Sequence, residues 1–326
     1  MARVTITEIA RRAGVSKGAV SYALNGQPGV SASTRARVLR VAAELDWVPN
    51  SAARMLSGAR TDTIGLVLAR GATREPSVLE FVAGMETVLA RHAQVLLLRM
   101  ASGVDEEVAG YRKWASERRV DAVVVVEVLV DDPRVALLGS LDLPALVAGD
   151  PGLAGGLAAV GVDDGAGVTA LVEHLVGRGH RTVGWVSGPA HLGRVHVRER
   201  AFAAAEGIAV RQHATDLTGG AVDAATRELL GGDDRPTAIV YDGGPAGVAG
   251  LSAIGRLGLR VPDDVAVVVW GDSAVCGVTE PALTAVGCDV AAYGAAVGEG
   301  VLGLVGGRLR GGMMGAVPTL RVRDSS

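Results

Sequence analysis

Polar side chains gather on one side of a short predicted helix near the start of the chain. At about 100° per residue, Val20, Ala23 and Leu24 project to the opposite, apolar side. The polar side carries Lys17, Gly18, Ser21, Tyr22 and Asn25. Ammonium, hydroxyl and amide groups can pair with base edges, and the major groove of DNA admits a helix that carries them. We therefore expect this face to contact double-stranded DNA.

Two helices joined by a tight turn must hold this face in place. Thr5 followed by Glu8 has the spacing of a capping box, so a first helix should begin there. Gly14 can adopt the positive φ that ends this helix, and Ser16 can cap the second. Ser31 should open a third helix. The expected core joins Ile9, Ala10, Val15, Val20 and Leu24 to Val38, Val41, Ala42 and Leu45. An ordinary helical hairpin is the alternative to a DNA-binding one.

The N-terminal segment resembles the DNA-binding headpiece of the LacI/GalR family of bacterial transcription regulators. The resemblance covers residues 4–26, 30–35 and 47–57, and the rest of the chain fits the family more loosely. It implies a regulator with a periplasmic-binding-protein-like body whose first lobe contacts a second copy of the chain. We expect a homodimeric repressor that binds a partly palindromic operator through two heads.

The resemblance also implies roles for single residues of the head. Lys17, Gly18 and Tyr22 lie at positions that read base edges in the family. Six polar residues lie at positions that contact phosphates, a contact that fixes register without reading sequence. They are Thr5, Ser16, Ser21, Asn25, Ser31 and Thr34. Tyr22 stands where arginine is frequent, so the bidentate recognition of guanine is not expected there.

The segment after Pro49 has the features of a hinge. Residues 52–56 are good helix formers, but so short a helix is not stable alone in water. We expect it to fold only on DNA. The resemblance implies that Ala53, Arg54 and Leu56 of paired hinge helices enter the minor groove, and that Leu56 wedges between base pairs.

Charge is divided unevenly between the head and the rest of the chain. Residues 1–60 hold nine basic and three acidic side chains, a net charge of +6, whereas the whole chain carries −3. The difference leaves −9 for the remainder. A basic head on an acidic body concentrates the attraction for phosphates in the head and makes DNA affinity depend on salt.

Length and composition limit the remaining possibilities. The chain has 326 residues, of which 49% are hydrophobic, enough to fill the core of one large or two medium domains beside the head. Cys276 and Cys288 have no metal-ligand spacing and suggest no disulfide framework. No apolar run has membrane-spanning length, and no secretory signal is recognised at the start. We expect a cytoplasmic protein with no cofactor, metal or membrane partner.

From about residue 61, apolar runs alternate with helix-length segments, which predicts two doubly wound α/β lobes. The first set has strands at 63–69, 95–100, 122–128 and 145–148 and helices near 78–91 and 106–118. The second has strands at 158–162, 182–187, 238–241 and 265–270 and helices near 165–178, 195–206, 221–230 and 247–257.

The expected domains follow from these patterns and from the resemblance. A helix-turn-helix head spans 1–46, a hinge spans 47–60 and an effector-binding and dimerisation body spans 61–326. Lobe one takes about 61–161 and 288–316, and lobe two takes about 162–287 and 317–326, with crossovers near Gly161 and Val286.

A small-molecule effector should bind between the lobes, beyond the carboxyl ends of the strands. Arg198 lies where many family members hold a sugar hydroxyl. The other expected contacts come from strand ends and are Tyr241, Asp242, Trp270 and Asp272. The alternatives are a surface ion pair for Arg198 and a core position for Trp270. Residues 75–78 lack the family's usual aromatic platform, which weakens the expectation of a simple sugar.

Two further functional classes stay open beside the effector-switched regulator. One is a regulator controlled by a protein partner, or by no effector, with a degenerate pocket. The other is an enzyme with an accessory head. Residues 298–303 spell a dinucleotide fingerprint but lie in a helix-length segment without a preceding strand, and His191 and His196 are poorly spaced for a metal. We therefore expect no catalytic activity.

Overall fold

The computed structural model describes residues 4–24, 28–47, 60–70, 76–232 and 234–326. Contacts divide the chain into two compact units, Met1–Thr61 and Asp62–Ser326. Four residues with predicted DNA contacts lie outside the described residues. They are Asn25, Ala53, Arg54 and Leu56.

The head is a three-helix unit made of α1 (Ile6–Ala13), α2 (Lys17–Leu24) and α3 (Ala32–Glu44). Gly14 ends α1 with a φ of 64°, as its lack of a Cβ allows. The Ser16 hydroxyl accepts a hydrogen bond from the Ala19 amide, and the Ser31 hydroxyl accepts one from the Thr34 amide. Both caps are confirmed. Ile9, Val20 and Val38 are fully buried at the centre of the head.

The capping box expected at the first helix is wrong. Thr5 does precede α1, but its side chain makes no capping hydrogen bond among the described residues. Glu8 instead pairs with Arg11 and Arg12, which lie one turn further along the same helix. Two charged partners on its own helix compete successfully with the single amide that a capping box would offer.

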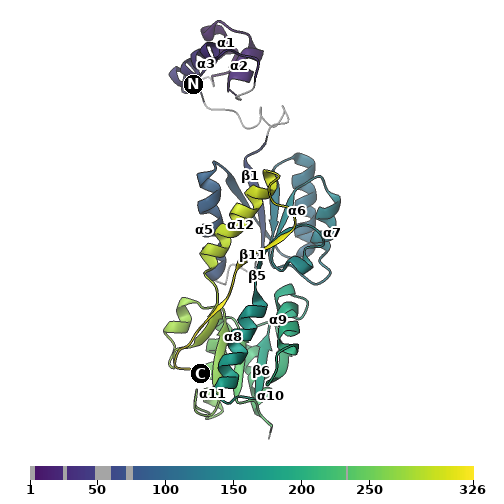
Figure 1. Cartoon of the computed structure of the whole chain (residues 1–326), viewed down its shortest axis with the longest axis vertical. Coiled ribbons are helices and arrows are strands. Elements are labelled where there is room, and N and C mark those ends of the chain that lie inside the picture. The colour runs from purple at the N-terminus through teal and green to yellow at the C-terminus, as the bar shows by residue number, and fades with distance from the viewer. Residues whose placement is uncertain (1–3, 25–27, 48–59, 71–75, 233) are drawn as a thin grey trace. The chain divides into compact units, whose positions relative to one another are not determined.

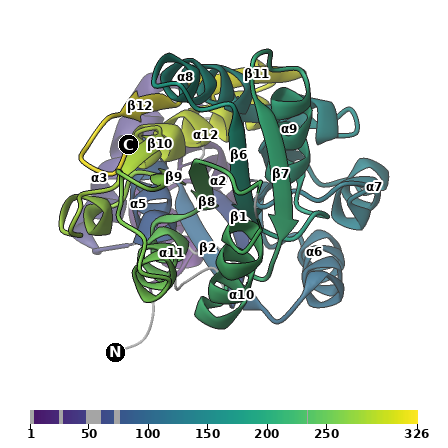
Figure 2. The ribbon, with the colours of Figure 1, turned by 90° about the horizontal axis from the view of Figure 1, so that it is seen from below.

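The second unit consists of two α/β lobes, each built around a six-stranded sheet (Figures 1 and 2). In lobe one the strand order is β11-β5-β4-β3-β1-β2. Its elements are β1 (Thr63–Ala69), α5 (Pro76–Arg91), β2 (Val95–Ala101), α6 (Val104–Glu117), β3 (Ala122–Val125), α7 (Pro133–Ser140), β4 (Ala145–Ala148), the short helix η2 (Pro151–Leu153), β5 (Ala158–Val162), α12 (Val290–Val305) and β11 (Gly312–Ala316).

Lobe two has the strand order β12-β10-β9-β8-β6-β7, in which only β12 is antiparallel to its neighbour among the described pairs. Its elements are α8 (Asp164–Gly177), β6 (Thr182–Ser187), α9 (Gly193–Ala203), β7 (Ala209–Ala214), α10 (Gly219–Leu230), β8 (Ala238–Asp242), α11 (Gly244–Arg256), β9 (Ala266–Trp270), the short helix η3 (Ala274–Gly277), β10 (Thr284–Gly287) and β12 (Thr319–Arg321).

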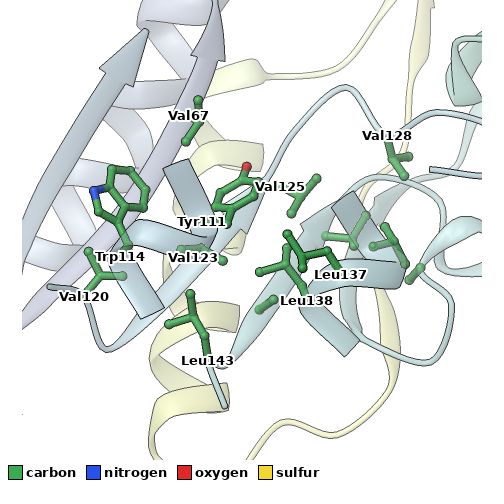
Figure 3. Close-up of a cluster of buried hydrophobic side chains, with 14 of the residues drawn as sticks. Val67, Tyr111, Trp114, Val120, Val123, Val125, Val128, Leu137, Leu138 and Leu143 are labelled. Atoms are coloured by element: carbon green, nitrogen blue, oxygen red, sulfur yellow. The ribbon is translucent and has the colours of Figure 1, made fainter. Parts of the chain in front are cut away.

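Helices cover both faces of each sheet. In lobe one, α5 and α12 pack on one face, and α6 and α7 pack on the other, where Tyr111 and Trp114 are buried (Figure 3). In lobe two, α8 and α9 cover one face of the sheet, and α10 and α11 cover the other. The expected fold class, a helix-turn-helix head with two doubly wound lobes, is confirmed.

One strand lies in a different sheet from the one that its position suggested. The strand pattern placed 158–162 at the start of the second set, whereas the crossover expected near Gly161 placed this strand in lobe one, where β5 pairs with β4 and with β11. The chain therefore crosses to lobe two only after this strand. Four strands escaped prediction because they are short or poor in the apolar runs that mark buried strands. They are β7, β10, β11 and β12.

Candidate functional site

The exposed face of α2 carries the residues expected to read DNA bases. Lys17 and Gly18 are exposed, and 46% of the Tyr22 surface is accessible. A Cβ built on Gly18 would meet no described atom closer than the Ser16 hydroxyl oxygen at 3.9 Å, so the helix surface is open there. Tyr22 is held over the backbone of Gly29, whose hypothetical Cβ would lie 3.1 Å from the Tyr22 ring.

The predicted phosphate-contacting residues that the structure describes lie at helix starts or on the same helix. Thr5, Ser16 and Ser31 are exposed, whereas Ser21 and Thr34 are half-buried. The Ser31 hydroxyl also donates a hydrogen bond to the Thr34 hydroxyl. A helix N-terminus with exposed hydroxyls is suited to phosphate oxygens, because its amides and partial positive charge attract anions.

In the second unit, a cleft between the two lobes contains two adjoining hollows of about 290 and 570 Å³. Both are lined by residues of lobe two and of lobe one, including its helix α12. They share Glu127 of lobe one, Arg194, Arg198 and Trp270 of lobe two, and Tyr293 of α12. Ligand pockets commonly measure ~300–1,000 Å³, so the combined space is large enough for a small molecule.

Arg198 is the centre of the lobe-two wall of this cleft. Its Nε lies 3.1 Å from an Asp164 carboxylate oxygen, and its Nη1 lies 3.2 Å from an Asp242 carboxylate oxygen. The guanidinium carbon also lies 4.1 Å from the centre of the Trp270 ring, within cation–π distance. The Arg198 residue is only 7% exposed. These three partners fix its orientation toward the cleft.

The two acids bound to Arg198 differ in their surroundings. Asp242 also accepts hydrogen bonds from the Trp185 indole and the Gly188 amide. Burial raises the pKa of Asp164 above its ordinary value, although the positive charge of Arg198 opposes the shift. Asp164 therefore gains a proton more readily than an exposed aspartate does.

The rim of the cleft joins the two lobes directly. The Val130 amide donates to the His191 carbonyl at 3.0 Å, and the Gly193 amide donates to the Val128 carbonyl at 2.8 Å. Beside these bonds, Arg194 of lobe two pairs with Glu127 of lobe one. We call these contacts, made by residues 127–130 and 191–194, the inter-lobe clasp.

The structure brings together three of the five predicted effector contacts, namely Arg198, Asp242 and Trp270. Trp270 was expected either in the core or at the effector site, and its position fits both: it belongs to the lobe-two core and lines both hollows. Asp272 lines the smaller hollow, but its carboxylate is held by Arg321 and Arg323.

Tyr241 does not reach the cleft. It is fully buried in the lobe-two core, and its hydroxyl lies 3.0 Å from the Thr226 hydroxyl, under α10 and α11. Successive strand residues point to opposite faces of a sheet, so Tyr241 and Asp242 cannot both face the same side. The sequence interpretation that joined them was wrong for Tyr241.

Sequence reasoning missed Asp164, Arg194 and Glu127 as cleft residues. Asp164 follows Asp163, which caps α8 by accepting a hydrogen bond from the Ala166 amide. Arg194 precedes Arg198 by four residues, the spacing that places two side chains on one helical face. That spacing was the available signal for Arg194.

Within the described part of the chain, no group of three or more histidine, cysteine, aspartate or glutamate side chains is arranged to hold a metal ion. Residues 298–303 lie inside α12, as their sequence context predicted. Among the described residues, no helix has both the length and the apolar character needed to cross a membrane.

A helix-turn-helix head followed by a two-lobed α/β unit with a central cleft defines a class of ligand-responsive DNA-binding regulators. Residues 5–50 match the model of bacterial regulatory proteins of the lacI family, and residues 172–326 match that of a periplasmic binding protein-like domain. The HTH-type transcriptional regulator CelR of Thermobifida fusca is 33% identical over 297 residues, which cover 87% of this chain and 86% of that protein.

Solved structures agree with this assignment. A LacI family transcriptional regulator from Bifidobacterium animalis subsp. lactis is 30% identical, with a TM-score of 0.77 over 82% of this chain and 98% of that one. A CelR–cellobiose complex is 28% identical, with a TM-score of 0.75 over 99% and 100% of the two chains. The chain belongs to the LacI family of bacterial regulatory proteins. It is a DNA-binding transcriptional regulator.

Proposed function

We propose that the protein is a homodimeric transcriptional repressor whose operator affinity is switched by a small molecule, a sugar or related metabolite, in the cleft between its lobes. It acts in the cytoplasm on a partly palindromic operator and catalyses no reaction. The main support for an effector in the cleft is the buried Arg198 at the cleft wall. Its orientation is fixed by Asp164, Asp242 and Trp270.

Oriented charged groups at a partly enclosed cleft favour a ligand rich in hydroxyl groups. Each hydroxyl can both donate and accept, and a buried polar group without a partner costs about 1–3 kcal/mol. A ligand with matching groups gains most from such a wall. The cellobiose bound by the related CelR supports a sugar as the first class to test.

The inter-lobe clasp supports a switch based on the angle between the lobes. Its hydrogen bonds form only where residues 128–130 of lobe one approach residues 191–193 of lobe two. A ligand that contacts both lobes changes the population of the state in which the clasp is formed. The size of the change is set by the difference between its affinities for the clasped and the separated lobes. This change is passed to the head and alters operator binding.

Selection of randomised duplex DNA on the full-length protein, followed by anisotropy titration of the enriched site, tests the proposal. A partly palindromic site should emerge, and one of glucose, maltose or cellobiose should change its affinity. Arg198→Gln should abolish the sugar response while keeping sugar-free operator binding. Arg200→Gln, an exposed change on the same helix, is the matched control.

Loss of a buried arginine destabilises lobe two, because Asp164 and Asp242 then lose their positively charged partner. Asp164→Asn provides a milder change, since the amide keeps the shape and one hydrogen-bond acceptor. A site without symmetry would contradict the dimeric repressor. An unchanged sugar response in both Arg198→Gln and Asp164→Asn would exclude this wall as the effector site, and no response to any sugar in the wild type would reject the sugar effector.

A further inference from the structure

The larger hollow extends into lobe one beyond the site built around Arg198. Its lobe-one lining includes Gly103, Val104 and Glu107 at the start of α6, together with Arg134 of α7. None of these four residues lines the smaller hollow. A ligand confined to the smaller hollow would therefore reach Arg198 and Asp272 but not Glu107 or Arg134.

Glu107 and Arg134 form a buried ion pair at this end. The Arg134 Nη1 lies 2.7 Å from a Glu107 carboxylate oxygen, and its other nitrogens donate to Asp132 and to the Glu127 carbonyl. Glu107 is 4% exposed and Arg134 is 3% exposed. Both residues line the larger hollow, so the ion pair borders the cleft.

A third polar group, the Tyr111 hydroxyl, lies beside this pair. Tyr111 lies one helical turn after Glu107 on α6 and is fully buried. Its hydroxyl has no hydrogen-bond partner among the described residues. Burial, together with the negative charge of Glu107, raises the pKa of Tyr111. Figure 3 shows the hydroxyl directed away from Leu143. An unsatisfied buried hydroxyl is costly, so this end of the hydrogen-bond network is incomplete.

The charges around the larger hollow are balanced. Three arginines and three acids line it, a net charge of zero. They are Arg134, Arg194, Arg198, Glu107, Glu127 and Asp242. Each cation already has an acidic partner. A charged ligand would find no counter-ion without breaking one of these pairs, whereas a neutral hydroxyl can add to a pair as both donor and acceptor.

We propose that Glu107 and Arg134 form a second subsite, in lobe one, for a sugar ring of a neutral ligand that has at least two rings. One ring lies at Arg198 and Asp242, and the second presents its hydroxyls to Glu107 and Arg134. Tyr111 is a positioning residue that acts through Glu107. This inference rests on the proposed function, because it names the ligand class of the same cleft.

Isothermal titration of the full-length protein with glucose, maltose and cellobiose tests the subsite. At least one disaccharide should bind more tightly than glucose. Glu107→Gln should weaken that disaccharide about tenfold and change glucose affinity less than twofold. Asp105→Asn removes the same charge from an exposed position in the same helical turn and should leave both affinities unchanged.

Tyr111→Phe keeps the proposal testable if Glu107→Gln fails to fold. This change removes a hydroxyl that makes no hydrogen bond of ordinary length among the described residues but interacts with the neighbouring Glu107 carboxylate, so the unfolding midpoint should not fall while the position of Glu107 should change. Disaccharide affinity should drop about fivefold, and glucose affinity should not, a split that a purely structural role for Tyr111 would not produce.

Three results would overturn the subsite. Wild-type disaccharide affinity in both Glu107→Gln and Tyr111→Phe would do so while leaving the proposed effector function intact. Equal weakening of glucose and disaccharide would show a general disturbance of the cleft rather than a second subsite. Failure of glucose and of both disaccharides to bind the wild type would overturn the sugar effector and the subsite together.

Discussion

Gly193 controls how closely the two lobes can approach at the inter-lobe clasp. It is the first residue of α9, and its amide donates to the Val128 carbonyl across the cleft. A Cβ at this position would lie 2.6 Å from that same carbonyl oxygen and 2.5 Å from the Leu153 Cδ1. Leu153 can rotate away, but the Val128 carbonyl is backbone and cannot. Gly193→Ala should therefore push lobe one and lobe two apart.

The size of this effect follows from two contributions. Forcing an extra methyl group into a packed contact costs typically 1–3 kcal/mol. Separation also breaks the two backbone hydrogen bonds of the clasp, each worth about 0.5–1.5 kcal/mol net. Because the overlap is relieved when the lobes separate, the two costs are alternatives rather than a sum. We expect the state with the clasp formed to be destabilised by about 2 kcal/mol, which lowers its population relative to the separated state roughly 30-fold.

Distances between spin labels on the two lobes measure this shift. Lys113 on α6 and Glu206 after α9 are exposed and accept labels after replacement by cysteine, in a background in which the half-buried Cys288 is serine. Gly193→Ala should move the distance distribution toward longer values and change operator affinity.

Gly139→Ala is the matched control, because a Cβ at Gly139 would meet no described atom within 4 Å. It should leave the label distances and the operator affinity as they are in the wild type. An identical distance distribution for Gly193→Ala and the wild type would refute the reasoning, since the lobes would then tolerate the overlap without separating.

Two further predictions concern the head and the core of lobe two. Tyr22→Ala should change the sequences enriched from a randomised pool while leaving the salt dependence of binding nearly constant, because Tyr22 is expected to contact bases rather than phosphates; an unchanged enriched motif would argue against base contact. Tyr241→Phe should lower the free energy of unfolding by about 1 kcal/mol, because the hydrogen bond between the Tyr241 and Thr226 hydroxyls is lost, although Thr226 still donates to the Val222 carbonyl. The sugar response should persist, and its loss would return Tyr241 to the effector site.

Sequence patterns predicted the elements whose signals are local. Gly14, Ser16 and Ser31 mark helix boundaries through their own backbone or hydroxyl groups, so their roles can be read within a few residues. Buried strands such as β8 stand out as apolar runs. The residues of β5 alone do not indicate which sheet it joins. That depends on its partners β4 and β11, which lie about 10 and 150 residues away along the chain.

The structure brings together part of the predicted effector site, and the physical reason is similar. Arg198, Asp242 and Trp270 follow from the expectation that strand ends and the adjoining helices meet at one edge of the sheet. The partnership of Arg198 with Asp164 spans 34 residues and depends on the packing of α8 against α9, which no local pattern encodes. Tyr241 shows the opposite case, because the alternation of strand residues was available in the sequence and excludes it from the cleft.

Arg194 and Arg198 lie one turn apart on α9 but depend differently on the lobes. Arg198 pairs with acids of its own lobe, so its contacts persist at any lobe angle. Arg194 pairs with Glu127 of lobe one, and this bond exists only when the lobes approach. Because both groups of that pair are partly exposed, the bond contributes only ~0–1 kcal/mol. The angle of the lobes therefore depends chiefly on the backbone contacts at Gly193 and on whatever ligand spans the cleft.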